Sequence, residues 1–477
     1  MSELKKLNVN PCKMCMPIGA AIAFKGIENS MLLMHGSQGC STYMRRHMST
    51  HYEEPIDIAS SSIDEQGTVY GGEDNLKQGL KNLIELYSPG VIGIVTTCLA
   101  ETIGEDIRRI VADFKQNNEL GSLALVTVST PGYGGSQFEG YYLSLRRIVE
   151  QLVEEPAHKT KKINLIAPNI SPAEIRELKR ILELFKLDYT ILPDIAQTLA
   201  APYTADYSKI PAGGTRLRSI KKMGEAAATI ELGALVDSSL SAAAYLEDKF
   251  AVPVYRLPLP IGLKNSDLLI NILAEISGRE IPAVLKEERG RLIDTMIDSH
   301  KYNGQGRAAL FGDPEIVYAV SSLCQENGVK TILMATGSNI ATFNNKLREI
   351  TAANREQSLI LNDTDFEEIR NYISEYKINL MLGNSDGAFI EEKDGIPLLR
   401  IGFPIHDRVG AARQQNIGYQ GTNTLLDRIT NQLLALKHDN FRENLYQKYY
   451  QPLSKSIAAE SFTEQSFQTA ELSVGDQ

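Results

Sequence analysis

The sequence predicts an α/β protein built from parallel sheets wound with helices. Short runs rich in Val, Ile and Leu alternate with longer stretches of helical period along most of the 477 residues. Almost every apolar run ends in a Gly, Pro or polar turn, as strands in such sheets do. The expected strands cover residues 31–34, 90–97, 123–130, 162–169, 187–194, 231–237, 307–313, 330–337, 358–363, 378–384 and 397–404.

Helices are expected between these strands, where apolar residues recur at a spacing of three or four. Three of them begin with residues that favour a helix N-terminus: Ser171 before Pro172, Asp313 before Pro314, and Asp365 before an FEEIRNYI run. The clearest helical stretches are residues 73–87, 172–185, 314–327 and 366–376.

The chain divides into three blocks and a tail. At roughly 150 residues per domain, the length suggests about three domains. Two turn-rich or charged seams, residues 154–160 and 300–306, separate the blocks. The expected domains are therefore residues 1–157, 158–303 and 304–452, followed by a polar tail at 453–477 that is rich in Ser, Glu and Gln.

Composition and charge exclude several classes of protein. Apolar residues make up 43% and charged residues 23%, which is ordinary globular usage. A formal net charge of −10 opposes nucleic acid as the main partner, and the basic run Arg45-Arg46-His47 is typical of a solvated helix face. No apolar run is long enough to span a membrane, and no secretory signal is evident, so a cytoplasmic protein is expected.

Four of the five cysteines lie in the first hundred residues, at Cys12, Cys15, Cys40 and Cys98. A disulfide framework is not expected in a chain of this kind. Cys12 and Cys15 form a C-x-x-C, but no second pair completes a zinc site, and no preceding strand supports a thioredoxin-type motif. The fifth, Cys324, has helical spacing with apolar neighbours and is expected in the core.

Cys15, Cys40 and Cys98 make a more informative group. Cys98 directly follows an expected strand, and Cys40 ends the turn HGSQGC after the run MLLM. Ligands of open α/β sheets bind where strands end, and thiolates are the usual ligands of iron–sulfur clusters. Three thiols leave a cubane one ligand short, which suggests a cluster shared with a second chain. The same spacing is equally typical of three buried small apolar residues.

Long motifs resemble the nitrogenase component 1 family, specifically its β-type subunits. They are NPCKMCMPIGAAIAFKGI, LMHGSQGCSTYMRRHMSTHYEEPIDIASSSIDEQGTVYGGEDNL and VIGIVTTCLAETIGEDI, followed by RGRLIDTMIDSHKY, FGDPEIVYAV, MLGNSDGAFI and LLRIGFPIHDRVGAARQQNIGYQGT. The resemblance covers roughly residues 9–437. Among β-type chains, the run STYMRRHMSTHYEEPIDIASSS is most similar to the NifN subfamily, which takes part in iron–molybdenum cofactor biosynthesis.

The resemblance implies three Rossmann-like domains and an α2β2 assembly in which α-type and β-type chains pair across an iron–sulfur cluster. It also implies that Cys15, Cys40 and Cys98 are the cluster and metal ligands. In NifN-type chains the cluster is a [4Fe-4S] group shared with a NifE-like subunit. That subunit holds most of the iron–molybdenum cofactor precursor.

Two features separate this scaffold function from the alternative, a catalytic β subunit with a P-cluster-type electron-transfer site. Catalytic β chains typically carry Ser where this chain has Gly132. Many NifN chains lack one or more of the three cysteines, whereas this chain keeps all of them. The sequence has no phosphate-binding glycine motif, so ATP is expected to act on a separate reductase, the nitrogenase iron protein. His35 is left with two alternatives: a hydrogen bond to a cluster sulfur or a purely structural role.

Overall fold

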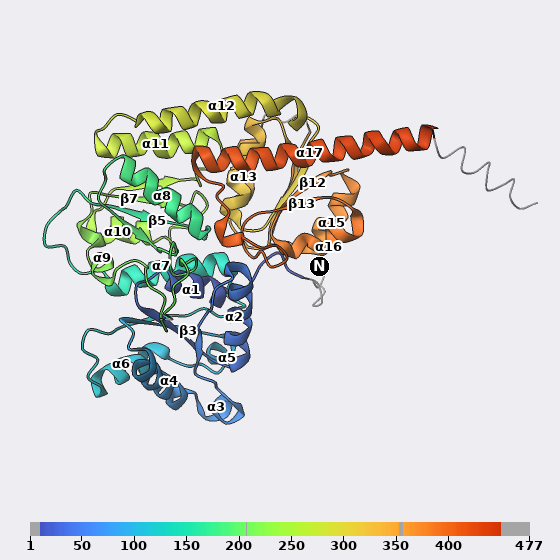
Figure 1. Cartoon of the computed structure of the whole chain (residues 1–477). Helices are drawn as coiled ribbons and strands as arrows, with labels where there is room; N and C mark the ends of the chain where they lie inside the picture. The colour runs from blue at the N-terminus through green and yellow to red at the C-terminus, as the bar shows by residue number, and fades with distance from the viewer. Residues whose placement is uncertain (1–9, 207, 353–355, 450–477) are drawn as a thin grey trace, which may run out of the picture.

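The computed structural model describes residues 10–449, except residues 207 and 353–355. Three lobes surround the centre of the molecule, each with its own parallel sheet (Figure 1). Every strand pair within the sheets is parallel, and helices cover the sheets. The predicted fold class, three parallel α/β units, is confirmed.

The first lobe holds a sheet in the order β2-β1-β3-β4. Because β1 and β3 are neighbours and run parallel, the segments after them emerge at the same sheet edge. Its elements are α1 (Met16–Lys25), β1 (Ser30–His35), α2 (Gln38–Tyr52), β2 (Ala59–Ser60), α3 (Glu65–Tyr70), α4 (Glu73–Tyr87), β3 (Val91–Thr96), α5 (Cys98–Thr102), α6 (Ile107–Asn117), β4 (Ala124–Val128) and α7 (Gln137–Leu152).

The second lobe has the order β6-β5-β7-β8. Its elements are β5 (Ile163–Ile166), α8 (Pro172–Leu184), β6 (Tyr189–Leu192), α9 (Leu217–Lys221), η1 (Met223–Glu225), β7 (Ala228–Leu232), α10 (Ala242–Phe250), β8 (Val254–Leu257) and α11 (Leu263–Ser277). The long helix α12 (Ala283–Asn303) lies beside α11 and leads to the third lobe (Figure 1).

The third lobe has a five-stranded sheet in the order β11-β10-β9-β12-β13. The final helix packs along α12, and its C-terminal part extends past the body of the molecule (Figure 1). The elements are β9 (Arg307–Phe311), α13 (Pro314–Glu326), β10 (Lys330–Thr336), α14 (Phe343–Thr351), β11 (Leu359–Asn362), α15 (Phe366–Glu375), β12 (Leu380–Gly383), η2 (Ser385–Gly387), α16 (Ala388–Asp394), β13 (Leu398–Arg400), η3 (Ala411–Arg413) and α17 (Gly418–Tyr449).

Helices α1 and α7 form the support on which the first lobe is built. All ten residues of α1 are buried, so the helix is enclosed on every side. Two glycines allow the close contact: a Cβ on Gly19 would lie 2.0 Å from the carbonyl oxygen of Gln137, and one on Gly140 would lie 2.1 Å from that of Met16. No larger residue fits at either position without moving the backbone.

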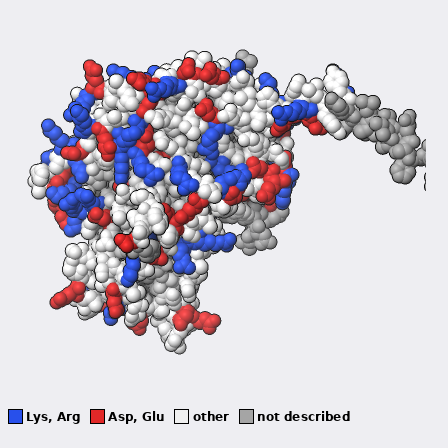
Figure 2. All heavy atoms as spheres, viewed as in Figure 1, with Lys and Arg blue, Asp and Glu red and all other residues white. Residues whose placement is uncertain are grey.

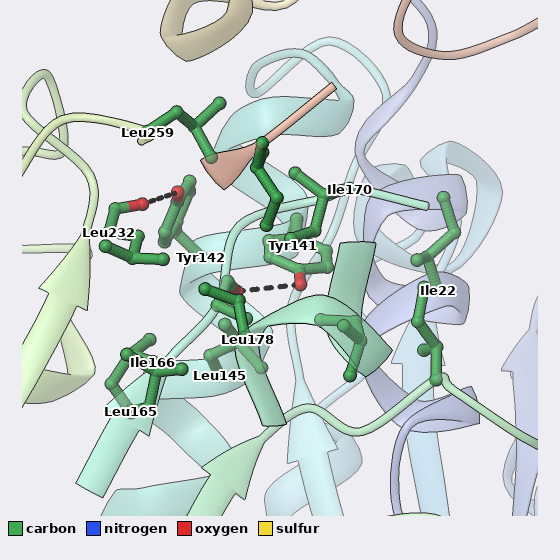
Figure 3. Close-up of a cluster of buried hydrophobic side chains, with 14 of the residues drawn as sticks. Ile22, Tyr141, Tyr142, Leu145, Leu165, Ile166, Ile170, Leu178, Leu232 and Leu259 are labelled. Carbon is green, nitrogen blue, oxygen red and sulfur yellow. Dashed lines mark hydrogen bonds between the residues drawn. The ribbon is translucent and has the colours of Figure 1, made fainter. Parts of the chain in front are cut away.

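The same helix α7 joins the first and second lobes in one hydrophobic core (Figure 3). Tyr141 donates a hydrogen bond to the carbonyl oxygen of Ala167 (3.0 Å), and Tyr142 donates one to that of Leu232 (3.4 Å). Both hydroxyls are buried, and these bonds satisfy them. The first sheet is therefore held rigidly against its neighbour.

Most sequence predictions of elements agree with the structure, and two differ for physical reasons. Helix α4 has the predicted bounds, and Ser171, Asp313 and Asp365 each cap a helix as expected. The strand expected at residues 231–237 instead spans Ala228–Leu232, because the N–H groups of Ala234 and Leu235 donate to the Glu315 carboxylate rather than to a strand.

The second difference is two strands that the sequence did not predict, β2 and β8. The first has only two residues, and the second follows Pro253 and contains Arg256. The domain boundaries at 157/158 and 303/304 stay predictions, and the tail at 453–477 lies outside the described residues.

The surface carries charges of both signs. Basic and acidic side chains are interspersed over the face shown in Figure 2, without a continuous basic surface. None of the helices in the described ranges is long and apolar enough to cross a bilayer.

Candidate metal-cluster site

The C-terminal ends of β1 and β3 place two cysteines at one edge of the first sheet. The backbone N–H of Thr97, after β3, donates to the carbonyl oxygen of His35 at the end of β1 (3.0 Å). A Cβ on Gly36 would lie 1.8 Å from the Thr97 hydroxyl oxygen, so only glycine permits this crossing. Cys40 and Cys98 follow the two crossing segments: Cys40 lies in the first turn of α2, and Cys98 is the first residue of α5.

Cys40 lies in the first turn of a helix, which differs from the expected turn. Helix α2 begins at Gln38, two residues before Cys40. The Ser37 hydroxyl donates to the Cys40 sulfur over 3.7 Å. Cys40 therefore sits among the first backbone N–H groups of α2, next to a hydroxyl donor.

Cys15 reaches the same region from α1. It caps the N-terminus of that helix and pairs by a β-bridge with Ser136, just before α7. On either side of the bridge, the Met14 N–H donates to the Gln137 side chain (2.6 Å), and the Gln137 N–H donates to the Met14 carbonyl oxygen (2.8 Å). The buried α1–α7 pair therefore fixes the position of Cys15.

The thiols of Cys15 and Cys98 meet at Gly132, which lies in the loop between β4 and α7. Its N–H donates to the Cys98 sulfur (3.1 Å). A Cβ on Gly132 would lie 3.1 Å from the Cys98 sulfur and 3.5 Å from the Cys15 sulfur, so these two sulfurs are neighbours across the glycine. Burial raises the pKa of Cys15, and the negative charges of Cys98 and Cys40 raise that pKa further. The Cys15 thiol thus lies close enough to both of the other cysteines to feel their charge.

These thiols are accessible, whereas the other two cysteines are not. Cys15 and Cys98 are exposed and Cys40 is partly exposed, while Cys12 and Cys324 are each 1% exposed. Cys324 packs in the main core, as predicted. Cys12 packs in the core of the third lobe beside residues such as Phe311 and Phe366, so the C-x-x-C does not form a ligand pair.

The arrangement suits a multi-iron group better than a single ion. Among the residues that the structure describes, no three His, Cys, Asp or Glu side chains are grouped closely enough to hold one metal ion. Thiolates of an iron–sulfur cluster bind different irons, so they stand farther apart than ligands of a single ion. Three accessible thiols could bind the irons of such a cluster, and the Gly132 N–H donates a hydrogen bond to one of the three sulfurs.

His35 and the two arginines are not part of the thiol group. His35 is fully buried, with Nδ1 3.0 Å from the Ser61 hydroxyl and Nε2 3.5 Å from a Glu105 carboxylate oxygen. Burial lowers its pKa, an effect that Glu105 opposes. Both ring nitrogens of His35 therefore face protein groups of the first lobe. Arg45 and Arg46 are exposed on α2, on the helix predicted for them.

The polar residues that hold the loop around Gly132 were not predicted from the sequence. The Glu101 carboxylate, three residues after Cys98, accepts hydrogen bonds from the hydroxyls of Thr96 (2.5 Å) and Ser129. A Glu three residues after a cysteine that begins a helix was visible in the sequence. Its acceptor role was not, because its partners come from two other segments.

Comparisons with known proteins agree with this architecture. The family description "Nitrogenase component 1 type Oxidoreductase" matches residues 15–434. This chain belongs to the nitrogenase component 1 family. Its relatives include the nitrogenase molybdenum-iron protein beta chain of Clostridium pasteurianum, which is 37% identical over 91% of this chain and 94% of that protein. The nitrogenase vanadium-iron protein beta chain of Trichormus variabilis is 33% identical over 90% and 96%.

Among solved structures, one of nitrogenase Cp1 at pH 6.5 superposes on this component 1 chain with a TM-score of 0.87. The two chains are 36% identical in sequence, and the match covers 91% of this chain and 95% of the Cp1 chain. A second Cp1 chain, from a structure at pH 5, has a TM-score of 0.67 at 16% identity, which shows the shared fold alone. The relatives named are β chains, as the sequence motifs predicted.

Proposed function

We propose that this chain is a NifN-like scaffold subunit for maturation of the nitrogenase iron–molybdenum cofactor. The proposal rests on Gly132, which adds no side chain at the point where Cys15 and Cys98 meet. Catalytic β chains typically carry Ser at the matching position, and its hydroxyl adds an oxygen that can approach a P-cluster. A site with sulfur donors alone suits a simpler [4Fe-4S] cluster.

The cluster is shared with a NifE-like α-type subunit in an α2β2 heterotetramer. Cys15, Cys40 and Cys98 would hold three irons, and the partner would supply the remaining ligand. Tyr43 and Tyr133 lie beside the thiol group and expose 49% and 68% of their surface. Aromatic side chains of this kind are typical of protein interfaces, and a covering chain would keep oxidants from the cluster. When bound, the cluster supplies one-electron transfer.

The cofactor precursor is held mainly by the partner subunit. The cavity at the centre of this chain, between the three lobes, has a volume of only about 30 Å³ and is lined by residues including His51, Glu174 and Phe403. That volume accommodates roughly one or two water molecules. A larger cavity of about 660 Å³ lies beside Lys25 and Asp57, and no cysteine lines it.

A catalytic β subunit with a P-cluster-type site is the second candidate. The retention of all three cysteines at one accessible edge favours it, as does similarity to β chains of molybdenum and vanadium nitrogenases. Both candidates place the chain in cytoplasmic nitrogen fixation with the nitrogenase iron protein as reductase. They differ in cluster size and in turnover of dinitrogen.

The test is anaerobic purification of the complex with its co-expressed α-type subunit. We expect a four-iron magnetic spectrum, transfer of a cofactor precursor to an apo catalytic protein, and no ATP-dependent reduction of dinitrogen when the iron protein is added. Sustained dinitrogen reduction with an eight-iron signal would establish the catalytic candidate instead. A stable monomer replete with iron would contradict the shared cluster.

A further inference from the structure

We propose that Glu101 is a positioning residue that sets the hydrogen bond from the Gly132 N–H to the Cys98 sulfur. The inference rests on the proposed function, because its readouts are properties of the bound cluster. Glu101 does not touch the three thiols. It acts through the loop that carries Gly132.

Two short segments form a closed ring at this site. Cys98 and Glu101 are separated by one turn of α5, and Ser129 and Gly132 are separated by the same number of residues in the loop after β4. The Ser129 hydroxyl donates to the Glu101 carboxylate at one end of the ring. The Gly132 N–H donates to the Cys98 sulfur at the other end. The Ser129–Glu101 hydrogen bond therefore helps to keep the Gly132 N–H aligned with the Cys98 sulfur.

A buried threonine pair connects this ring to the sheet. The hydroxyl of Thr96, the last residue of β3, donates to Glu101 and accepts the N–H of Thr130 (2.8 Å). The Thr130 hydroxyl donates back to the Thr96 carbonyl oxygen (2.8 Å). Both threonines are fully buried. A single carboxylate oxygen, Oε1 of Glu101, therefore ties the end of β3 and the loop to the helix that begins with Cys98.

This arrangement bears on the electronic properties of a bound cluster. Hydrogen bonds to cluster sulfurs stabilise the reduced state and raise the reduction potential. If Glu101 loses its two accepted hydrogen bonds, Ser129 loses its partner and the Thr96–Thr130 pair alone ties the 129–132 segment to the sheet, so the N–H···S contact weakens. A negative charge near the cluster has the opposite effect on the potential, so charge and geometry must be separated experimentally.

The experiment compares Glu101→Ala with Glu101→Gln in the anaerobic complex. Both variants remove the charge, but the glutamine oxygen still accepts from Thr96 and Ser129. We expect both to retain iron. Glu101→Ala should have a more negative reduction potential than Glu101→Gln. It should also lose the coupling of an exchangeable proton to the cluster, measured by pulsed proton ENDOR in H₂O and D₂O, whereas Glu101→Gln should keep it.

Two further variants protect the test. Glu326→Ala is a matched control, because Glu326 also ties a helix end to a neighbouring segment, by accepting the N–H groups of Leu263 and Lys264 in another lobe. It should leave the potential and the proton coupling unchanged. If Glu101→Ala fails to assemble, Ser129→Ala removes one exposed donor and should shift both readouts partway.

Equal potentials and equal proton couplings in Glu101→Ala and Glu101→Gln would overturn the inference while leaving the proposed function intact. Absence of iron from the unmodified complex would instead overturn the proposed function. The two failures are therefore distinguishable.

Discussion

Cys12 and Cys15 are three residues apart, yet they lie in opposite environments. Cys12 fills the third lobe, where its carbonyl oxygen accepts the Gly337 N–H (3.1 Å) and its N–H donates to the Thr364 carbonyl oxygen (3.3 Å). Burial raises the pKa of its thiol far above the usual range. Cys15 is exposed at the edge of the first sheet. The availability of a thiol for metal binding thus depends on what covers the strand ends, and the cysteine spacing alone does not decide it.

The largest effect is expected from disrupting the close contact between helices α1 and α7, which positions Cys15. Gly140→Val would place side-chain atoms against the Met16 carbonyl oxygen, which a Cβ already approaches to 2.1 Å. We expect a loss of more than about 4 kcal/mol of stability, measured by denaturant unfolding, or no soluble protein. Gly290→Ala in α12 is the control: its Cβ would meet nothing within 4 Å, so stability should stay the same or rise slightly.

The next largest effect is a loss of iron from the complex, which we expect when an accessible cysteine is replaced but not when a buried one is. Cys15→Ala, Cys40→Ala and Cys98→Ala should each remove most of the iron from the purified complex, because each deletes a thiolate ligand. Cys324→Ala, in the main core, should retain the iron. Elemental analysis of complexes purified in parallel checks this. Unchanged iron in any one of the three variants would exclude that residue from the ligand set.

A third effect concerns the C-terminal end of α2, where His51 of the first lobe contacts Ile405 of the third. His51 is buried, and its Nδ1 accepts the Ile405 N–H (2.9 Å). Burial, together with the charge of His406, lowers the pKa of His51 to about 3. The unfolded chain binds this proton near pH 6.5, so stability is fully present above that pH and is lost as pH falls toward 3.

Between pH 7 and pH 5, His51 should account for about 2 kcal/mol of lost stability. His51→Gln should remove that part of the pH dependence, measured by unfolding at both pH values, although it lowers stability at pH 7. An identical slope in His51→Gln and the unmodified protein would contradict this account.

The sequence predicted most elements whose signals are local. The helix at 73–87 follows from its apolar spacing, and the cap at Ser171 from the residue before a proline. It could not predict the end of β7, because Glu315, eighty residues later, takes the N–H groups that would have continued the strand. The parallel strands β1 and β3 predict that Cys40 and Cys98 lie at one sheet edge, but the contact of Cys98 with Gly132 comes from a third segment, the loop after β4.

The smallest effect is expected at Cys12. Its substitution can be compared directly with that of Cys15, because the two cysteines belong to the same C-x-x-C. Cys12→Ala removes one buried sulfur from an apolar cluster, which should cost about 1 kcal/mol of stability and leave the iron content unchanged. Cys15→Ala should do the reverse, with loss of iron and little change in the stability of the metal-free chain. If Cys12→Ala also lost the iron, the C-x-x-C would act as a unit, and coverage by the third lobe would not explain the difference between the two thiols.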